Sequence, residues 1–157
     1  MMLTHIDKKG NAKIVDISKK NPTKRTAIAS GKIKVSNNVI KTIKDNNNKK
    51  GDIFTVAKIA GILAAKNTSG LIPLCHPLKI ENITIEFIID DKNNLIEVLS
   101  SVTCFEKTGV EMEALCATSV SLLTIYDMCK AIDNSMMILD IKLLKKIGGK
   151  NNLKKSK

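Results

Sequence analysis

The sequence predicts a single α+β domain in which helices pack against an antiparallel sheet. A chain of 157 residues fits one domain and is long enough to bury a core. Its apolar residues follow strand and helix periods in the order strand, helix, helix, strand, strand, helix, strand. The two adjacent strands are joined by a short polar turn, which is typical of an antiparallel hairpin.

The composition indicates an ordinary globular protein. Hydrophobic residues make up 43% of the chain and charged residues 26%, and both fractions are typical of such proteins. No apolar run approaches the roughly 20 residues that span a bilayer. The first residues, MMLTHIDKKGN, lack the apolar core of a secretory signal. We therefore expect a cytoplasmic protein with no membrane partner.

Four cysteines are widely spaced and form no CxxC pair: Cys75, Cys104, Cys116 and Cys129. Metal clusters and small disulfide frameworks have tighter spacings. We expect four reduced thiols and no metal site.

The N-terminal part of the chain reads as an arm followed by the first strand and helix. Residues 1–26 lack clear periodicity and are broken by Asn21-Pro22, so we predict a flexible arm. Alternating apolar residues predict a strand over 27–35. Ser36 stands before apolar residues at helical spacing and is predicted to cap a short helix.

A second helix is predicted to begin at Asp52, after the polar turn 45–52, because aspartate is a favoured N-cap. Ser69-Gly70 is predicted to end it. Four small residues along this helix permit close packing against a neighbour: Ala60, Gly61, Ala64 and Ala65.

The stretch LIPLCHPL (71–78) places a proline on each side of Cys75-His76. Proline fixes φ and restricts the residue before it, so we predict a stiff extended segment and no helix. A side chain on such a backbone is well placed for catalysis or phosphate binding. A structural, hydrogen-bonded histidine is the equally plain alternative.

The second half of the sheet follows from alternation. Ile83 to Ile89 alternate strictly, and the return over 95–104 completes a hairpin. A last strand is predicted over 136–144. We place the domain at 27–147, and a flexible basic tail at 148–157.

The stretch 107–131 predicts a central helix. Thr108 and Glu111 have the spacing of a capping box, and the apolar residues that follow are too dense for a helix with a wide wet face. Burying charge is costly unless each charge has a partner or a task. Four charged residues lie on this helix: Glu111, Glu113, Asp127 and Lys130. They are candidates for functional residues; the alternative is that they form a narrow solvent-facing side of the helix.

Two of these charges are too far apart for one small ligand. Glu113 and Asp127 are fourteen residues apart, or about 21 Å along a helix. Asp127 and Lys130 are neighbours on one face and could share acid–base work, or form an ordinary salt bridge. If Glu113 and Asp127 are both functional, a neighbouring subunit must complete the site, which predicts an obligate oligomer.

The charge pattern leaves two kinds of anionic partner open. Lys49 and Lys50 precede the predicted helix N-terminus at Asp52, a position that favours anions, although a solvated turn is the simpler reading. The net charge of +11 suits nucleic acid or a polyanionic substrate. Aromatic residues make up only 3% of the chain, which argues against a stacking platform for single strands.

Six strings in order, KKGD, IAGILAAK, LIPLCHPL, KTGVEMEAL, LTIYDMCKA and KIGGK, closely resemble the molybdenum cofactor biosynthesis protein C family, the cyclic pyranopterin monophosphate synthases. The resemblance covers the chain from about Leu3 to Lys150. It implies a ferredoxin-like antiparallel sheet with helices on one face. It also implies a homohexamer, a trimer of dimers with active sites at the dimer interface.

The implied reaction converts (8S)-3',8-cyclo-7,8-dihydroguanosine 5'-triphosphate, a cyclised dihydro-GTP, into cyclic pyranopterin monophosphate and diphosphate, a lyase step of molybdopterin synthesis. The resemblance implies that Asp127 and Lys130 are catalytic, with Lys50 across the interface and His76 as a further proton carrier. We interpret Lys130 as the general acid–base and Asp127 as the group that holds it. The substrate-binding positions implied are Leu74, Cys75, His76, Met112, Glu113 and Glu111, and, for phosphates, Arg25, Lys20 and Lys146.

Three points stay open at this stage. Glu106 stands where the family more often has glycine, and adds a negative charge near the site. No cofactor is expected to be required, with magnesium left open as a companion of the diphosphate. The alternatives to the enzyme are a basic nucleic-acid-binding protein without catalysis and a catalytically silent assembly subunit; we expect no nucleic-acid partner.

Overall fold

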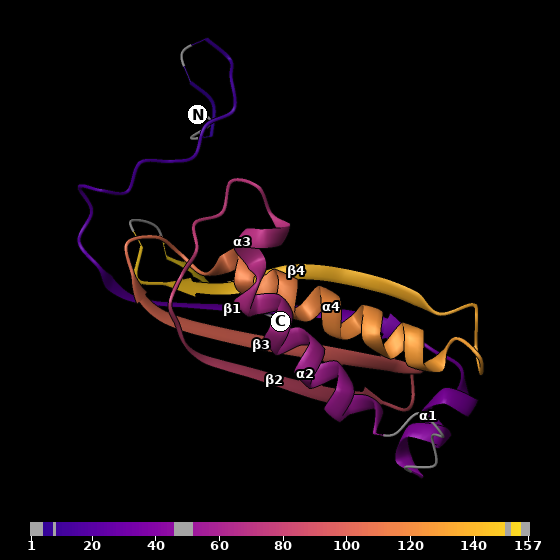
Figure 1. Cartoon of the computed structure of the whole chain (residues 1–157). Coiled ribbons are helices and arrows are strands. Elements are labelled where there is room, and N and C mark those ends of the chain that lie inside the picture. The colour runs from indigo at the N-terminus through magenta and orange to yellow at the C-terminus, as the bar shows by residue number, and fades with distance from the viewer. Residues whose placement is uncertain (1–4, 8, 46–51, 150–151, 155–157) are drawn as a thin grey trace.

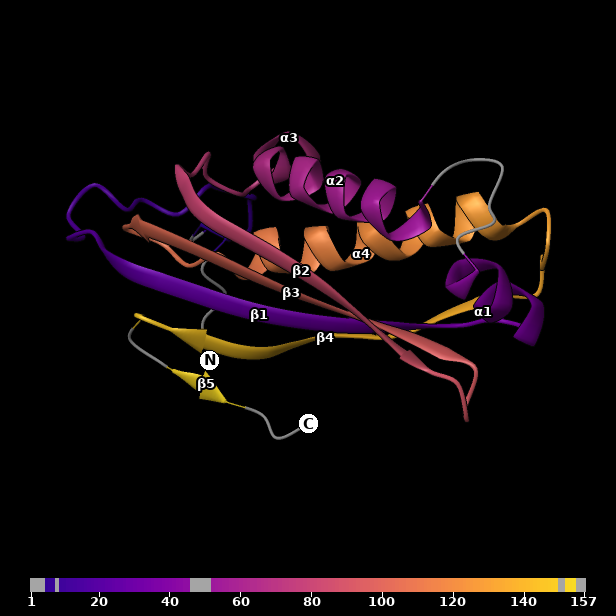
Figure 2. The same cartoon turned by 90° about the horizontal axis from the view of Figure 1, so that it is seen from below.

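One antiparallel sheet, in the strand order β2-β3-β1-β4-β5, forms the body of the chain. The structure, a computed structural model, describes residues 5–7, 9–45, 52–149 and 152–154. Helices α2 and α4 lie on one face of the sheet, and α1 lies at one end of it (Figures 1 and 2). The elements are β1 Thr23–Lys34, α1 Asn37–Lys44, α2 Ile53–Lys66, α3 Thr68–Leu71, β2 Ile80–Asp90, β3 Leu95–Glu106, α4 Glu111–Cys129, β4 Met137–Ile147 and β5 Leu153–Lys154.

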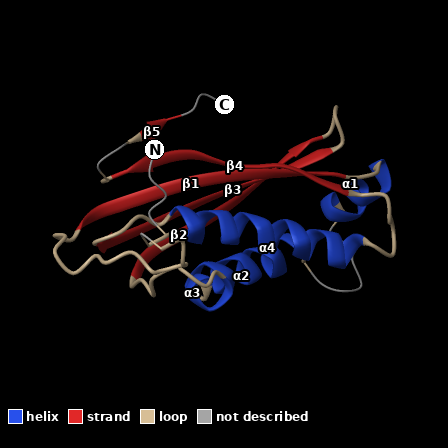
Figure 3. Cartoon of the chain, turned by 90° about the horizontal axis from the view of Figure 1, so that it is seen from above, coloured by secondary structure: helices blue, strands red, loops and turns tan. Residues whose placement is uncertain are grey.

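The predicted fold class is confirmed, because these elements make a single α+β domain of ferredoxin-like architecture. Figure 3 shows both long helices on the same side of the strands. Strand β1 is central and pairs with β3 along its whole length, from Thr23 opposite Glu106 to Lys34 opposite Leu95. It begins four residues before the predicted strand, so part of the expected arm belongs to the sheet. In the part of the chain that the structure describes, no helix is long and apolar enough to cross a membrane.

Small residues allow α4 to approach its neighbours closely. A Cβ at Gly31 of β1 would lie 2.7 Å from Leu122 Cδ1, and a Cβ at Gly61 of α2 would lie 2.6 Å from Ile85 Cδ1 and collide with Ser121 Oγ. Ser121 Oγ donates to the Ala57 carbonyl at 3.0 Å. The predicted close packing of the small-residue helix is therefore confirmed at Gly61.

Only one of the predicted helix caps is confirmed. Asp52 Oδ1 accepts from the backbone N–H groups of Phe54 and Thr55. Ser36 occupies the N-cap position of α1, but its side chain makes no cap hydrogen bond; its N–H instead donates to Asp133 Oδ2 at 2.8 Å.

Two predicted helix boundaries are wrong. Helix α4 begins at Glu111 after Val110, and no side chain caps it. The Glu111 carboxylate cannot serve a capping box because it pairs with Lys146 Nζ at 2.8 Å. Helix α2 ends at Lys66, and the predicted stop signal Ser69-Gly70 lies inside the short helix α3.

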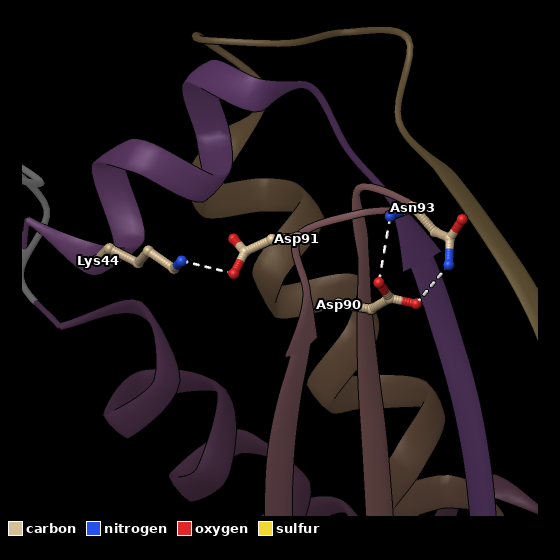
Figure 4. Close-up of polar contacts among 4 residues, drawn as sticks. All are labelled: Lys44, Asp90, Asp91 and Asn93. Carbon is tan, nitrogen blue, oxygen red and sulfur yellow. Dashed lines mark hydrogen bonds and ion pairs between the residues drawn. The ribbon is translucent and has the colours of Figure 1, made fainter.

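The far end of the sheet is closed by the β2–β3 hairpin. Asp90 Oδ1 and Oδ2 accept from the backbone and side-chain nitrogens of Asn93 at 3.1 and 2.7 Å, and Asn94 adopts a left-handed φ of 52°. Lys44 of α1 pairs with Asp91 at 2.6 Å (Figure 4). Exposed pairs of this kind contribute little to stability, so the pair mainly orients α1 against the hairpin.

Candidate active site

Two adjoining pockets lie at the opposite end of the sheet, where α4 begins. The first, which we name the basic pocket, has a volume of about 550 Å³. The second, the His76 pocket, has a volume of about 400 Å³. They share four lining residues: Lys20, Thr108, Gly109 and Glu111. One ligand can therefore occupy both pockets.

Among the described residues, four cationic side chains and one acid line the basic pocket. The cations are Lys20, Arg25, Lys107 and Lys146, and the acid is Glu111. Clustered cations with backbone donors bind phosphate groups through charge-assisted hydrogen bonds. The pocket therefore suits a polyanion. Its other lining residues are Asn21, Thr26, Thr108, Gly109, Val110, Ile147 and Gly149.

Hydrogen bonds hold Arg25 in place, and the backbone conformation at the end of β4 places Lys146. Arg25 Nε donates to the Glu106 carbonyl at 3.2 Å and Arg25 Nη2 to the Lys107 carbonyl at 3.5 Å. At the end of β4, Gly148 has a left-handed φ of 96°, and a Cβ there would collide with the Lys24 carbonyl. Only glycine allows β4 to end this close to β1, which brings Lys146 to the pocket.

The His76 pocket is lined by less charged groups. Leu74, Cys75, His76 and Leu78 come from the segment between α3 and β2. This segment contains no helix or strand from residue 72 to 79, so the prediction that the proline-flanked stretch is non-helical is confirmed, apart from Leu71, which ends α3. The predicted extended shape is wrong at the start of the stretch, where Cys75 N donates to the Ile72 carbonyl at 3.1 Å and closes a turn. Met112 and Glu113 come from the first turn of α4, and His5 and Val15 from the N-terminal segment.

Glu113 is the buried acid of this pocket. Its residue is 4% exposed, and burial raises the pKa of its carboxyl to about 7, with a further increase from the negative charge of Glu111 and a decrease from a hydrogen bond to its own backbone. Ser100 Oγ donates to the Ala114 carbonyl at 2.7 Å and so fixes the adjoining turn of α4 to β3. A carboxyl with such a pKa can accept or release a proton near neutral pH.

The Cys75 thiol is held in its neutral form. Burial raises its pKa, and the nearby charges of Glu113 and Cys116 raise it further. A thiolate nucleophile needs an environment that lowers the thiol pKa, so Cys75 lines the pocket as a neutral group. All four cysteines are free thiols, as predicted.

Asp127 and Lys130 lie far from both pockets within one chain. They sit at the C-terminal end of α4, and Lys130 Nζ pairs with Asp127 Oδ1 at 2.6 Å. Their side chains are 64% and 56% exposed, so the expectation of apolar surroundings is wrong for the single chain. The hydrogen bond and charge of Asp127 raise the pKa of Lys130. The fourth predicted catalytic residue, Lys50, lies outside the described residues.

The remaining predicted positions come together at the two pockets. Every predicted substrate-binding residue lines at least one of them: Lys20, Arg25, Leu74, Cys75, His76, Glu111, Met112, Glu113 and Lys146. Glu106 lines neither; its Oε1 accepts from Lys79 N at 3.4 Å, which turns the extra acid toward the start of β2.

Sequence reasoning missed several lining residues. Lys107, Thr108 and Gly109 belong to the KTGVEME string and could have been found by extending the motif by three positions. His5 and Val15 carry no local signal, because only tertiary docking of the N-terminal segment brings them to the pocket.

Among the described residues, no group of three or more histidine, cysteine or acidic side chains is placed to hold a metal ion.

Comparison with known proteins identifies the family model that fits this chain. Residues 14–149 match the MoaC family. The cyclic pyranopterin monophosphate synthase of Clostridium perfringens (strain SM101 / Type A) is 54% identical over 149 residues, which cover 95% of this chain and 94% of the relative. The synthase of Thermoanaerobacter pseudethanolicus is 51% identical over 153 residues, covering 98% and 97%.

A longer relative also matches this chain. Molybdenum cofactor biosynthesis protein moc-5 of Caenorhabditis elegans is 49% identical over 149 residues, which cover 95% of this chain and 25% of the relative. The matching unit is therefore also found as part of a longer protein.

Proposed function

Because this chain belongs to the MoaC family, we propose that it is a cyclic pyranopterin monophosphate synthase. It is a lyase of molybdenum cofactor biosynthesis that converts (8S)-3',8-cyclo-7,8-dihydroguanosine 5'-triphosphate into cyclic pyranopterin monophosphate and diphosphate. One structural observation supports this function most directly: the basic pocket and the His76 pocket join at Lys20 and Glu111. A triphosphate and the ring system attached to it fit such a pair of pockets.

The basic pocket binds the triphosphate. Lys20, Arg25 and Lys146 line the pocket and supply positive charge and hydrogen-bond donors, and Arg25 is already oriented by two backbone carbonyls. Binding of the phosphates competes with the Lys146–Glu111 ion pair. The charge that the substrate brings replaces that of Glu111, so Lys146 remains paired throughout.

The His76 pocket binds the ring system. Leu74, Cys75 and Met112 offer neutral contacts, and Glu113 lies buried among them. A carboxyl at this place can hydrogen-bond to the amide edge of the pterin. Because its pKa is near 7, it can accept a hydrogen bond as the carboxylate or donate one as the acid.

Proton transfer is assigned to Lys130, with His76 as a second carrier. Asp127 holds the Lys130 ammonium at 2.6 Å and thereby orients it. Lys50 stabilises phosphate charge or assists proton transfer. His76 lines a pocket at one end of α4, whereas Asp127 and Lys130 stand at its other end, so the proposal requires a partner subunit that brings Asp127 and Lys130 to the pockets. Lys50 is proposed to come from across the same interface.

Exposed apolar residues support a homo-oligomer with interfacial active sites. Four large apolar side chains on the outer faces of α2 and α4 are between 40% and 60% exposed: Val56, Ile59, Leu63 and Leu123. Leu123, Asp127 and Lys130 follow the four- and three-residue spacing of one helix stripe. A partner that covers the apolar residues therefore also meets the Asp127–Lys130 pair. We assign a hexamer, a trimer of dimers, on this basis and on family membership.

The remaining assignments concern cofactor and compartment. The proton carriers named above are side chains of the protein, so we propose that no resident cofactor is required. A magnesium ion, where present, belongs with the diphosphate leaving group. Four free thiols agree with a cytoplasmic location.

The decisive experiment is turnover by the purified chain. Incubation with the cyclised dihydro-GTP should release diphosphate and form cyclic pyranopterin monophosphate in equal amounts. Random oligonucleotides provide the comparison for the alternative function, since phosphate-only binding weakens steeply with salt. Intact oligomers that bind oligonucleotides and release no diphosphate would refute the synthase assignment.

A further inference from the structure

His5 and Val15 belong to the His76 pocket although about seventy residues separate them from its other walls. Both line the pocket, together with Lys20 from the same N-terminal segment. Other walls of the same pocket include His76 and Glu113. The segment therefore forms one side of the ring-binding pocket.

The loop that carries His5 is a built structure. A bridge joins Ile6 to Ala12, and Lys13 N donates to the His5 carbonyl at 2.9 Å. Asp7 Oδ1 accepts from Lys9 N and Asn11 N, each at 2.8 Å; the hydrogen bond from Asn11 is the largest of the causes that lower the pKa of the Asp7 carboxyl. The backbone of His5 is thus held by these contacts between the two ends of the loop.

Two alternate residues of the segment after this loop are partly buried. Val15 and Ile17 are half-buried, whereas Ile14, Asp16 and Ser18 between and beside them are exposed. This period of two is that of an extended chain with one face against the protein. Val15 therefore points toward the pocket as part of a regular pattern.

A lysine of the basic pocket ties this segment to the site. Lys107 Nζ donates to the Ser18 carbonyl at 3.1 Å. Asp16 Oδ1 accepts from Ser18 N at 2.8 Å, and the positive charge of Lys107 also acts on the Asp16 carboxylate. The N-terminal segment and the phosphate-binding wall are therefore linked through one side chain.

We propose that His5 and Val15 are substrate-contacting residues that position the ring of the bound substrate in the His76 pocket. This inference rests on the proposed function and extends it. A neutral imidazole presents one donor and one acceptor, which can pair with polar atoms of a guanine-derived ring other than the amide edge assigned to Glu113. Val15 adds an apolar contact beside it. Both act on binding and leave the proton transfers to other groups.

The test compares kcat and KM for the wild type and four variants with the cyclised dihydro-GTP. His5→Ala should raise KM about tenfold, the effect of one lost hydrogen bond, with kcat within about twofold. His5→Gln keeps a donor and an acceptor and should recover most of the loss. Val15→Ala should raise KM about threefold. Ile14→Ala, its exposed neighbour, serves as the matched control and should behave like the wild type.

Gel filtration and thermal midpoints should be unchanged in all four variants. The inference is overturned if His5→Ala and Val15→Ala keep the wild-type KM, or if they lower kcat alone. It is also overturned if Ile14→Ala shows the same defect as Val15→Ala. An inactive wild type overturns the proposed function as well, and so is distinguished from a failure of this inference alone.

Discussion

Glu113 and Asp127 stand at opposite ends of α4, fourteen residues and about 21 Å of helix axis apart. Glu113 is buried in the His76 pocket, whereas Asp127 is exposed and paired with Lys130. One chain thus presents the binding half of a site at one end and a candidate proton carrier at the other. This separation is the physical reason for proposing that two chains share each active site.

Replacing Lys130 with alanine should abolish turnover and leave substrate binding largely intact. Lys130 is proposed as the proton carrier, whereas Lys20, Arg25 and Lys146 of the basic pocket are proposed as the phosphate ligands, so the loss of Lys130 should stop proton transfer and leave the phosphate contacts in place. Single-turnover kinetics and equilibrium binding, measured on the same preparation, separate the two effects. Substantial turnover in Lys130→Ala would contradict the assignment.

Lys146 should be a phosphate ligand. Lys146→Ala is expected to weaken diphosphate binding about tenfold, the magnitude of one charge-assisted hydrogen bond. Glu111→Gln should strengthen it about threefold, because the ion pair at 2.8 Å no longer competes for Lys146. Lys142→Ala, on the same strand and outside the pocket, is the control. Equal effects of Lys142→Ala and Lys146→Ala in calorimetric titration would show that only overall charge matters.

Glu113 should make the free energy of unfolding depend on pH. Its carboxyl pKa rises from 4.5 to about 7 on folding, so between these values the folded chain holds a proton that the unfolded chain has lost. This contribution is fully present below pH 4.5 and is lost as the pH rises through about 7. Wild type should therefore lose up to about 3 kcal/mol relative to Glu113→Gln across this range. Urea titrations at several pH values measure the difference, and parallel curves would argue against it.

Gly61 should be required for the contact between α2 and α4. Gly61→Ala places a methyl group against Ile85 and Ser121, and overpacking of this kind costs about 1–3 kcal/mol. Gly70→Ala is the matched control, because its new methyl group meets only the side chain of Asn67, which can move. Thermal melts should rank wild type and Gly70→Ala together above Gly61→Ala. Equal melting of both variants would mean that the helices separate without cost.

The element order and fold class could be predicted because period and turn chemistry are local properties. Asp52 caps α2 for the same reason: its oxygen reaches N–H groups two and three residues ahead. The capping box of Thr108 and Glu111 failed because the Glu111 carboxylate has a partner 35 residues away, Lys146. A sequence pattern that spans only a few residues around Glu111 does not include Lys146.

The site was predictable to the extent that motifs name its residues. The motifs identified Lys146, His76 and Glu113, but only the fold shows that they line two joined pockets. His5 escaped because its place depends on how the N-terminal segment docks. The exposure of Lys130 could not be derived from helix composition either, since a dense apolar pattern does not say which stripe another chain covers.

Mixed assemblies of two inactive chains test the shared site most directly. Glu113→Ala and Lys130→Ala chains, each inactive alone, are unfolded together, refolded and assayed with the cyclised dihydro-GTP. If each site takes Glu113 from one chain and Lys130 from its partner, random pairing in dimers restores about a quarter of wild-type activity. Activity that stays at the level of the separate variants, in assemblies shown to be mixed, would contradict the account.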